Sequence, residues 1–447
     1  MVELLRDRSS SPIRMFTYTL LNKPGFRFSP TNAAASHEDR LRGIARFGPY
    51  KRVETEPQIA FVFPTGYRDA ANTLYLALRN GIGLFKGLPS VFKVPLEKDQ
   101  AIPITGFTLA NPHNHHDCAQ RYRDAIQTWM ASHQTKPDIF VTLHPKSMAW
   151  EDDSEYSATK AILLREGLLS QNVTFELIQS SAQFEWAAAN IALAIFAKLG
   201  GIPWAVDRPN AEGEIVIGMG RSETFDVATR ERKRFMAFAT CLQTNGIYRF
   251  STLGKICSDH DSYVEELENT LRLTLRRTHE SSADIRMLAL HFPKEFSFDE
   301  RKRCQRIAEE EQARFPRVEF VKVTDEERFF ALDDESPDQV PRRGTCIRLN
   351  RSDHLLYTEG SEERQTWANR PPSAVRIRHY RNDQEIDGAT REVIGQVFDL
   401  SMSNWRAFNA RGYPVSILYS TLISRILRHA DLTTEQSERL GERMWFL

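Results

Sequence analysis

The sequence predicts an α/β protein in two parts, and the order of its strand-like and helix-like segments is the main reason. Residues 56–205 alternate short apolar runs with amphipathic helical patterns, which predicts parallel strands joined by crossover helices. Residues 206–447 open with strands and bring in helices later, which predicts a mixed sheet. Residues 1–55 carry a strand-like MFTYTLL run and a polar loop ending in RFGPYKR, so we expect a lead-in segment before the two parts.

Each part is expected to hold several strands and helices of ordinary length. In the first part, apolar runs and helical periodicity predict strands at 59–64, 104–109, 138–145 and 173–179, and helices at 67–80, 116–133, 156–164 and 186–199. In the second part we expect strands at 214–220, 247–254, 286–293, 318–323, 345–350 and 355–358, and helices at 261–277, 299–314, 391–400 and 416–429. A basic run at 230–234 fits either a solvated helix face or a surface that meets a nucleic-acid duplex.

Composition describes an ordinary globular protein and narrows the function classes. The chain has 447 residues, enough for two or three domains, and it lacks an apolar run of the length that a membrane span needs. Five scattered cysteines without a CxxC pair predict reduced thiols in the cytoplasm and no zinc site. The 59 basic residues equal the 59 acidic ones. A nucleic-acid function would therefore need positive charge concentrated in one pocket or channel, or supplied by a partner.

Four polar residues stand at a spacing that suits a phosphate pocket. Tyr156 and Lys160 are one helical turn apart, so they share a helix face. Gln171 follows a short loop, and Lys198 closes a second helix. An aromatic ring can stack on a base, two ammonium groups can neutralise a terminal phosphate, and an amide can donate to its oxygens. By themselves, Tyr156 and Lys160 also fit an exposed helix face, and Lys198 fits a partner of the helix dipole.

The spacing of these residues, together with the runs AKLGGIPW and EIVIGMG that follow, resembles the Mid and Piwi domains of Argonaute and Piwi proteins. The resemblance implies a Rossmann-like Mid domain over 56–205 and a ribonuclease H-like Piwi domain over 206–447. The runs RFGPYKR and LYLALRNGIGLFKGLP fit the same group. Residues 1–55 are too few for the N-terminal and PAZ domains of a full-length Argonaute. The chain therefore resembles a short prokaryotic Argonaute.

The resemblance also implies a role for each pocket residue. Tyr156 would stack on the first base of a guide strand, and Lys160 and Lys198 would contact its 5′ phosphate. Gln171 would donate a hydrogen bond to that phosphate. The apolar tail MWFL would be buried so that the carboxylate of Leu447 enters the pocket, where Mg²⁺ would lie between it and the phosphate.

The positions expected to carry catalytic carboxylates depart from the family pattern. Slicing Argonautes hold two metal ions with carboxylates of the ribonuclease H fold. The first position falls on Gly220 and the second at Pro293, and neither side chain can bind a metal. We interpret the nearby Glu223 and Asp226 as surface acids on a loop or helix. The sequence therefore predicts a guide-binding chain that is not a nuclease.

An inactive guide-binding chain of this class implies an effector. The resemblance implies a 5′-phosphorylated guide RNA, a complementary single-stranded DNA target from an invader, and a partner with an APAZ region. That partner would carry a sirtuin-like, TIR or nuclease domain and would be activated by target pairing, in cytoplasmic defence. Two alternatives stay open. One is a self-sufficient guide-directed nuclease, and the other is a stand-alone nucleic-acid binding protein. A neighbouring gene for an APAZ effector would separate these readings.

Overall fold

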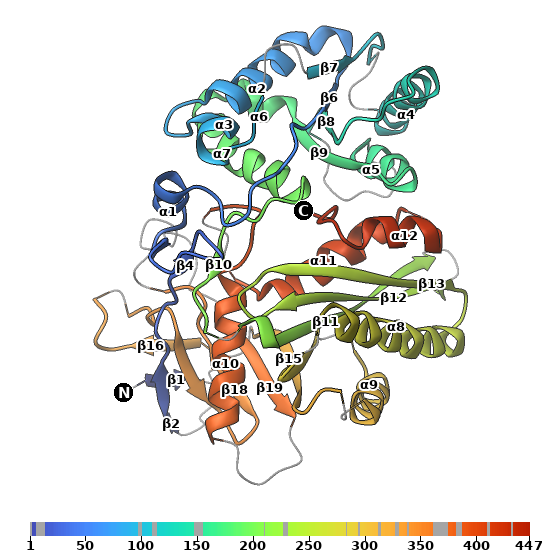
Figure 1. The fold of residues 1–447 in the computed structure, drawn as a ribbon. Helices are drawn as coiled ribbons and strands as arrows, with labels where there is room; N and C mark the ends of the chain where they lie inside the picture. Colours follow the sequence, from blue (N-terminus) through green and yellow to red (C-terminus); the bar gives the residue numbers. More distant parts are fainter. Residues whose placement is uncertain are drawn as a thin grey trace.

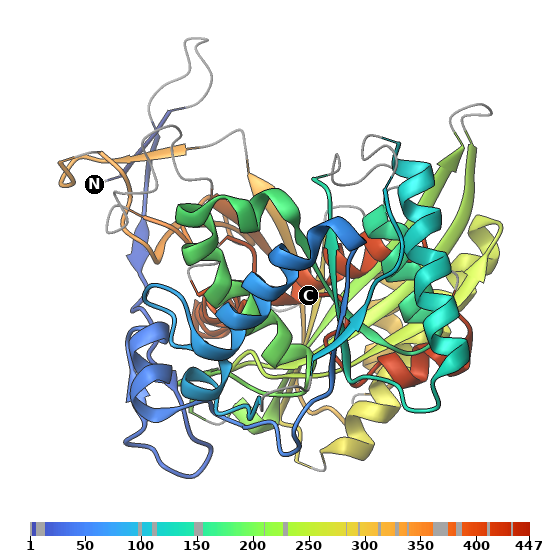
Figure 2. The same cartoon turned by 90° about the horizontal axis from the view of Figure 1, so that it is seen from above.

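The protein folds into two α/β parts, each a sheet with its helices, and these parts are called layers below. The C-terminal residue lies between them (Figure 1). Seen from above, that residue lies near the middle of the molecule (Figure 2). The computed structural model describes residues 2–5, 14–96, 101–109, 114–146, 155–209, 211–226, 231–282, 284–293, 296–311, 314–326, 330–337, 339–360, 374–380, 387–408, 412–430 and 432–447.

The smaller layer is a parallel sheet with helices packed around it. Its strands follow the order β7-β6-β8-β9, all parallel, as the alternating pattern predicts. The strands are β6 Ile59–Val62, β7 Ala101–Ile104, β8 Ile139–His144 and β9 Leu169–Thr174. The helices are α2 Arg68–Asn80, α3 Gly87–Val91, α4 His115–Ser132, α5 Glu155–Arg165, α6 Phe175–Gln179 and α7 Ser181–Lys198.

Two of the strands expected in this layer are wrong in their bounds. The strand predicted at 104–109 ends at Ile104, because Gly106 has a φ of +102° that an extended strand cannot contain. The strand predicted at 173–179 lies earlier, at β9, and its second half is the helix α6. Phe175 and Ile178 are buried and three residues apart, which is a helical spacing that a short apolar run does not reveal.

The larger layer is a nine-stranded mixed sheet. Its centre follows the order β13-β12-β11-β14-β15, with an antiparallel meander β11-β12-β13 and parallel strands β14 and β15 beside β11. These strands are β11 Glu214–Asp226, β12 Glu231–Gln243, β13 Tyr248–Cys257, β14 Met287–Phe292 and β15 Val318–Glu326. The sheet continues through β19 Ala374–Tyr380, β18 Asp353–Leu356, β17 Thr345–Arg348 and β3 Tyr18–Leu20.

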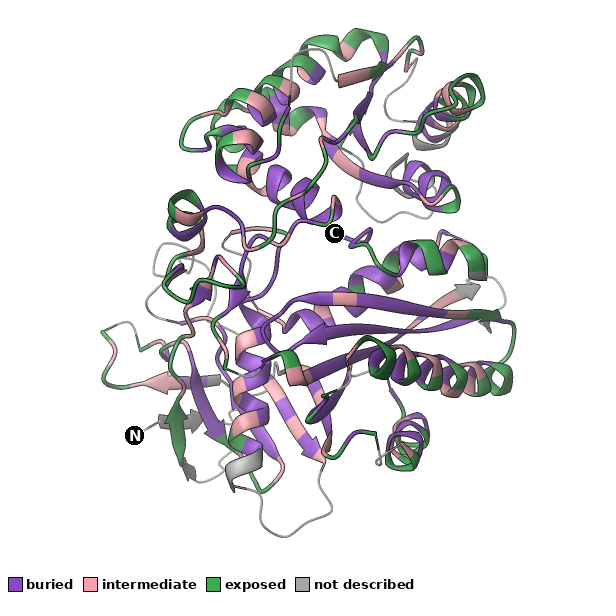
Figure 3. Cartoon of the chain, viewed as in Figure 1, coloured by how far each residue is buried: buried purple, intermediate pink, exposed green. Residues whose placement is uncertain are grey.

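Helices cover both faces of this sheet (Figures 1 and 3). They are α8 His260–Ser281, α9 Phe298–Glu310, α10 Asp387–Ser401, α11 Val415–Leu427 and α12 Thr434–Leu440. The start of α9 is fixed by a capping box in which the Ser297 side chain accepts from Glu300 N and the Glu300 carboxylate accepts from Ser297 N. The helix ends at Glu310, four residues earlier than the sequence pattern indicates.

The strand β12 was missed because both of its faces are buried. Met236, Phe238 and Leu242 join the core cluster that also contains α11, while Phe235 and Ala237 join the cluster that contains α8. A strand buried on both faces reads as a continuous apolar run without alternation. The basic run before it is also part of this strand from residue 231, so a helix face there is wrong.

The lead-in segment is woven into the rest of the fold. Its strand β3 pairs with β17, and β1 Val2–Leu5 pairs with β2 Arg14–Phe16 and with β16 Phe330–Asp333. Strands β4 Phe26–Arg27 and β5 Ser36–His37 form a small sheet with β10 Ala205–Val206, next to the helix α1 Arg40–Phe47. One core cluster includes residues of this segment and of both layers. The domain limits at 55 and 205 stay a prediction.

The described part of the chain contains no helix that combines the length and the apolar character needed to cross a lipid bilayer. All five cysteines are buried, and none forms a disulfide.

Candidate nucleic-acid binding sites

Two lysines meet inside the protein where the two layers touch. Lys160 lies on α5 and is only 2% exposed, and Lys198 is the last residue of α7 and is 1% exposed. The Lys198 ammonium donates to Ser170 O at 2.7 Å and to Gln171 Oε1 at 2.7 Å. Both acceptors are neutral, so these bonds satisfy two of its three protons without balancing its charge.

The last residue of the chain reaches the same place. Lys160 Nζ donates to a main-chain oxygen of Leu447 at 3.4 Å. Leu447 is buried, and the ring of Phe446 packs between Tyr248 and Tyr419, with centroids 5.5 and 5.0 Å away. The expected burial of the apolar tail is confirmed, and it holds the Leu447 oxygen beside Lys160.

Electrostatics make this pocket receptive to an anion. Burial lowers the pKa of Lys198 well below its ordinary value, and the neighbouring charges of Lys160 and Arg406 lower it further. An ammonium group that has lost water and faces another cation gains more from an incoming anion than a solvated one does. The pocket therefore offers concentrated positive charge within a chain whose total charge is balanced.

The structure brings together four of the five residues that the sequence singled out for this site. Lys198 contacts Gln171, Lys160 contacts Leu447, and the charge of Lys160 is near enough to lower the pKa of Lys198. Gln171 follows the short loop 166–168, as expected, and lies within β9. Its amide Nε2 donates to Asn172 O at 3.1 Å. Its oxygen, which faces Lys198, is the part directed at the pocket. Tyr156 belongs to α5, but its side chain lies outside the described residues.

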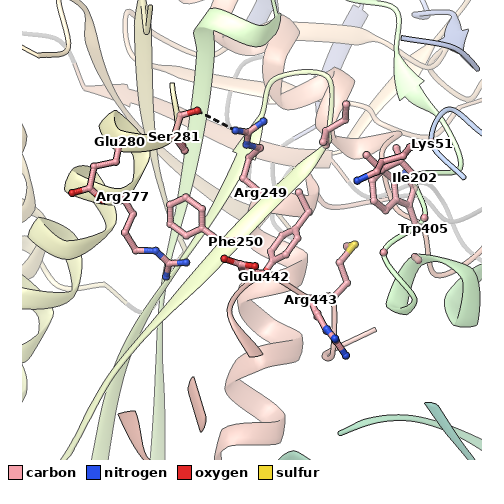
Figure 4. A pocket seen from close by; sticks show the side chains of 16 residues that line it. Lys51, Ile202, Arg249, Phe250, Arg277, Glu280, Ser281, Trp405, Glu442 and Arg443 are labelled. Carbon is pink, nitrogen blue, oxygen red and sulfur yellow. Dashed lines mark hydrogen bonds between the residues drawn. The ribbon is translucent and has the colours of Figure 1, made fainter. Parts of the chain in front are cut away.

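A cavity of about 630 Å³ is lined by sequence neighbours of Lys198 and Leu447 and was missed by sequence reasoning (Figure 4). It borders Gly200 and Gly201, just after Lys198, and Met444, just before the buried tail. Lys51 and Trp405 lie on one side of it, and Arg249, Arg277 and Phe250 lie on the other, as Figure 4 shows.

Cations outnumber acids in this cavity. Its charged lining consists of Lys51, Arg249, Arg277, Glu280, Glu442 and Arg443. Arg277 Cζ lies 4.2 Å from the centroid of the Phe250 ring, and Arg249 donates to Ser281 O at 3.4 Å. These residues are far apart in the sequence. The one available signal was Lys51 in the RFGPYKR run.

A second cavity, of about 300 Å³, contains the two positions expected to have lost their carboxylates. Gly220 and Pro293 both line it, so the structure brings these two positions together. A Cβ atom at Gly220 would lie 2.3 Å from Cε2 of the buried Phe238, and the same strand approaches α11 so closely that a Cβ at Gly218 would lie 2.1 Å from Ser416 O. Any side chain at Gly220 would therefore require Phe238 to move.

The acids near this cavity are strand residues, which corrects the loop or helix assignment of Glu223 and Asp226. Arg221 Nη1 lies 3.0 Å from Glu300 Oε1, and its Nε lies 3.7 Å from Glu223 Oε2, so Glu223 is part of an ion-pair network. The side chain of Asp226 lies outside the described residues. Within the described residues, no group of three or more His, Cys, Asp or Glu side chains is arranged to hold a metal ion.

Comparison with known proteins finds similarity to Argonaute and Piwi proteins. The model of the Piwi domain matches residues 148–291, which span from the α5 region to β14. The chain is 24% identical over 457 residues to "Protein argonaute" of Cereibacter sphaeroides, covering 93% of this chain and 57% of that protein. It is 22% identical over 315 residues to "Piwi protein" of Archaeoglobus fulgidus, covering 65% of this chain and 71% of that protein.

Two solved structures share the fold. One is Clostridium butyricum Argonaute bound to a guide DNA and a target DNA, with a TM-score of 0.68, 14% identity, and coverage of 93% of this chain and 53% of that chain. The other is Drosophila Piwi, with a TM-score of 0.70, 15% identity, and coverage of 98% and 57%. The predicted mixed α/β fold with a Piwi domain is confirmed, and the matches support an Argonaute-like protein. The chain spans little more than half the length of the first relative.

Proposed function

We propose that this chain is the guide-binding subunit of a short Argonaute system, and that it anchors the 5′ phosphate of a small guide RNA. The observation that carries the proposal is the meeting of Lys160 and Lys198 inside the protein, beside Gln171 and Leu447. A terminal phosphate bears more negative charge than a phosphodiester and has three exposed oxygens, so it can accept from both ammonium groups at once. Tyr156, on the same helix as Lys160, would stack on the first base.

A divalent cation fits this pocket only together with the phosphate. Mg²⁺ keeps several of its waters and typically binds one or two carboxylates together with substrate phosphates. A main-chain oxygen of Leu447 would be its protein ligand, and the ion would offset the repulsion between that oxygen and the phosphate. Lys160 contacts the Leu447 oxygen, so the cation would be needed only when the phosphate brings a second negative group beside it.

The cationic cavity beside the pocket gives the guide a path. Its lining begins next to Lys198 and carries arginines that suit backbone phosphates. Bases of the guide held there would pair with a complementary single-stranded DNA target. Sequence specificity would then come from base pairing, while the protein contacts the backbone.

We further propose that the chain recognises its target without cutting it. Two-metal cleavage needs carboxylates at both positions that here are Gly220 and Pro293. The close packing of Phe238 against Gly220 supports this proposal, because the strand is built around the absence of a side chain at that position.

The response to a target would come from a partner protein. An effector with an APAZ region, joined to a sirtuin-like, TIR or nuclease domain, would complete the nucleic-acid channel and become active when guide and target pair. The balanced charge of the chain supports a channel shared with a second protein. Such a complex would act in the cytoplasm as a defence against invading DNA.

Guide binding tests the proposal. Matched RNA strands that differ only in a 5′ phosphate or a 5′ hydroxyl are titrated against the protein, with a 5′-phosphorylated DNA strand of the same sequence alongside. We expect the phosphate to strengthen binding of the RNA by about a hundredfold or more, on the order of two charged hydrogen bonds. Equal affinity for phosphate and hydroxyl strands would reject the pocket, and stronger binding of the DNA strand would reject RNA as the guide.

A further inference from the structure

The cavity around Gly220 and Pro293 has a charge opposite to that of a metal site. Its charged lining consists of three arginines, Arg221, Arg425 and Arg428, and one acid, Glu223. A site for two divalent cations concentrates negative charge, whereas this lining has an excess of positive charge. The chemistry of the cavity therefore suits an anion.

Two of these arginines lie together at the C-terminal end of α11, Arg425 in its last turn and Arg428 as its C-cap residue. Arg425 and Arg428 are three residues apart, so they lie on the same helix face, and both are exposed. The helix is fixed to the sheet beneath them, because Ser424 Oγ donates to Arg221 O at 2.9 Å and Ser222 Oγ donates to Ser424 O at 2.9 Å. The two guanidinium groups therefore extend from a rigid support at the edge of the cavity.

The third arginine, Arg221, forms ion pairs with two acids. Arg221 is held by Glu300 at 3.0 Å and lies 3.7 Å from Glu223. These two carboxylates offset the charge of Arg221, and Arg425 and Arg428 are the other two cations that line the cavity. Guanidinium groups match the oxygens of a phosphate in pairs, and they keep their charge at every physiological pH.

We propose that this cavity holds a phosphodiester of the bound target strand, gripped by Arg425 and Arg428 in place of metal ions. The inference rests on the proposed function, because it takes the strand in the cavity to be the target of a guide. The degenerate site would then contribute affinity for the target at one backbone position, where a cutting site would contribute cleavage.

The test combines a double variant with a backbone scan. A target DNA is prepared as a series in which one phosphodiester at a time is replaced by a neutral methylphosphonate. With wild-type protein loaded with guide, we expect one position, or two adjacent ones, at which the neutral linkage weakens target binding about tenfold. In Arg425→Ala/Arg428→Ala, the unmodified target should bind about tenfold more weakly, and the sensitivity at that position should vanish.

The matched control is Arg303→Ala/Arg306→Ala, which removes the same charge at the same spacing from α9. It should bind the target as the wild type does, and the scan should keep its sensitive position. The proposal is overturned when the α11 variant keeps wild-type target affinity and scan, or when both variants lose affinity equally. Loading of the 5′-phosphorylated guide is measured separately on every variant. When loading itself fails, the scan is repeated on a preformed guide–target duplex, so the two proposals fail independently.

Discussion

The two pockets of this protein hold positive charge in opposite ways. Lys160 and Lys198 are almost fully buried, and Lys198 donates to two neutral acceptors, so the charge of Lys198 costs free energy until an anion binds. Arg425 and Arg428 are exposed at the edge of their cavity, so their charges keep most of their hydration and are screened by water. From this difference we expect the lysine pocket to discriminate between strand ends, and the arginine cavity to add affinity with little discrimination.

Removing both lysines should have the largest effect on guide binding. In Lys160→Ala/Lys198→Ala, affinity for a 5′-phosphorylated guide should fall by a hundredfold or more, because each charged hydrogen bond contributes about 1.5–3 kcal/mol. Affinity for a 5′-hydroxyl guide should change little. Both values come from equilibrium titration.

The matched control for the lysine variant is Lys86→Ala/Lys93→Ala, which removes two exposed lysines from the same layer. It should bind both guides as the wild type does. Equal losses for phosphate and hydroxyl guides in the Lys160/Lys198 variant would mean that those lysines support the fold and do not read the phosphate. Thermal unfolding of both variants separates these cases.

A second prediction addresses the strand beneath the arginine cavity. Gly220→Ala should destabilise the protein by about 1–3 kcal/mol, because the added Cβ meets the ring of Phe238 at 2.3 Å. Gly395→Ala is the control, since a Cβ there meets no atom within 4 Å and alanine favours the helix. Urea unfolding measures both. Equal stability of the two variants would show that Gly220 is not fixed by packing.

Gly220→Asp extends the same experiment to chemistry. The variant should not cleave a target, because the second position is still Pro293 and a two-metal site needs more than one carboxylate. Cleavage by this single variant would mean that other acids complete the site.

A smaller effect should appear in the pH dependence of the lysine pocket. Burial and Lys160 lower the pKa of Lys198 in the folded protein, so between that pKa and 10.5 the unfolded chain binds more protons. Stability should therefore rise with pH across this window in the wild type, and the rise should be smaller in Lys198→Met. A phosphate in the pocket would raise the pKa, so guide binding in the window should take up protons. Calorimetry in two buffers of different ionisation enthalpy measures this uptake, and its absence for the 5′-phosphorylated guide would contradict the role of Lys198.

Most of the fold could be predicted from the sequence, but only part of the candidate sites could. Strands such as β8 and helices such as α4 were predictable because their apolar periodicity is strong and local. The helix α6 was not, because five residues are too few to distinguish a helical from an extended apolar run. The burial of β12 between two helical layers is a tertiary feature that no local pattern contains.

The same limit explains what was found and missed at the sites. Lys160, Gln171 and Lys198 were singled out because a family spacing links them, and in the structure Lys198 contacts Gln171 while Lys160 contacts Leu447. Their role in guide binding stays a prediction. Arg425 and Arg428 were missed because nothing in α11 indicates that the end of this helix borders the cavity of Gly220, more than two hundred residues earlier in the chain. A cluster of positive side chains from distant segments of the chain can be recognised only from the tertiary structure.

The most direct test of recognition without cleavage is one incubation with two readouts. Wild-type protein is loaded with a 5′-phosphorylated guide and mixed with complementary single-stranded DNA that is labelled at one end, with Mg²⁺ and separately with Mn²⁺. Gel shift reports whether the target is bound, and a denaturing gel at nucleotide resolution reports whether it is intact. The account predicts a bound target that stays full-length with either metal. Guide-dependent cleavage at one defined phosphate would contradict it and establish the chain as a nuclease in its own right.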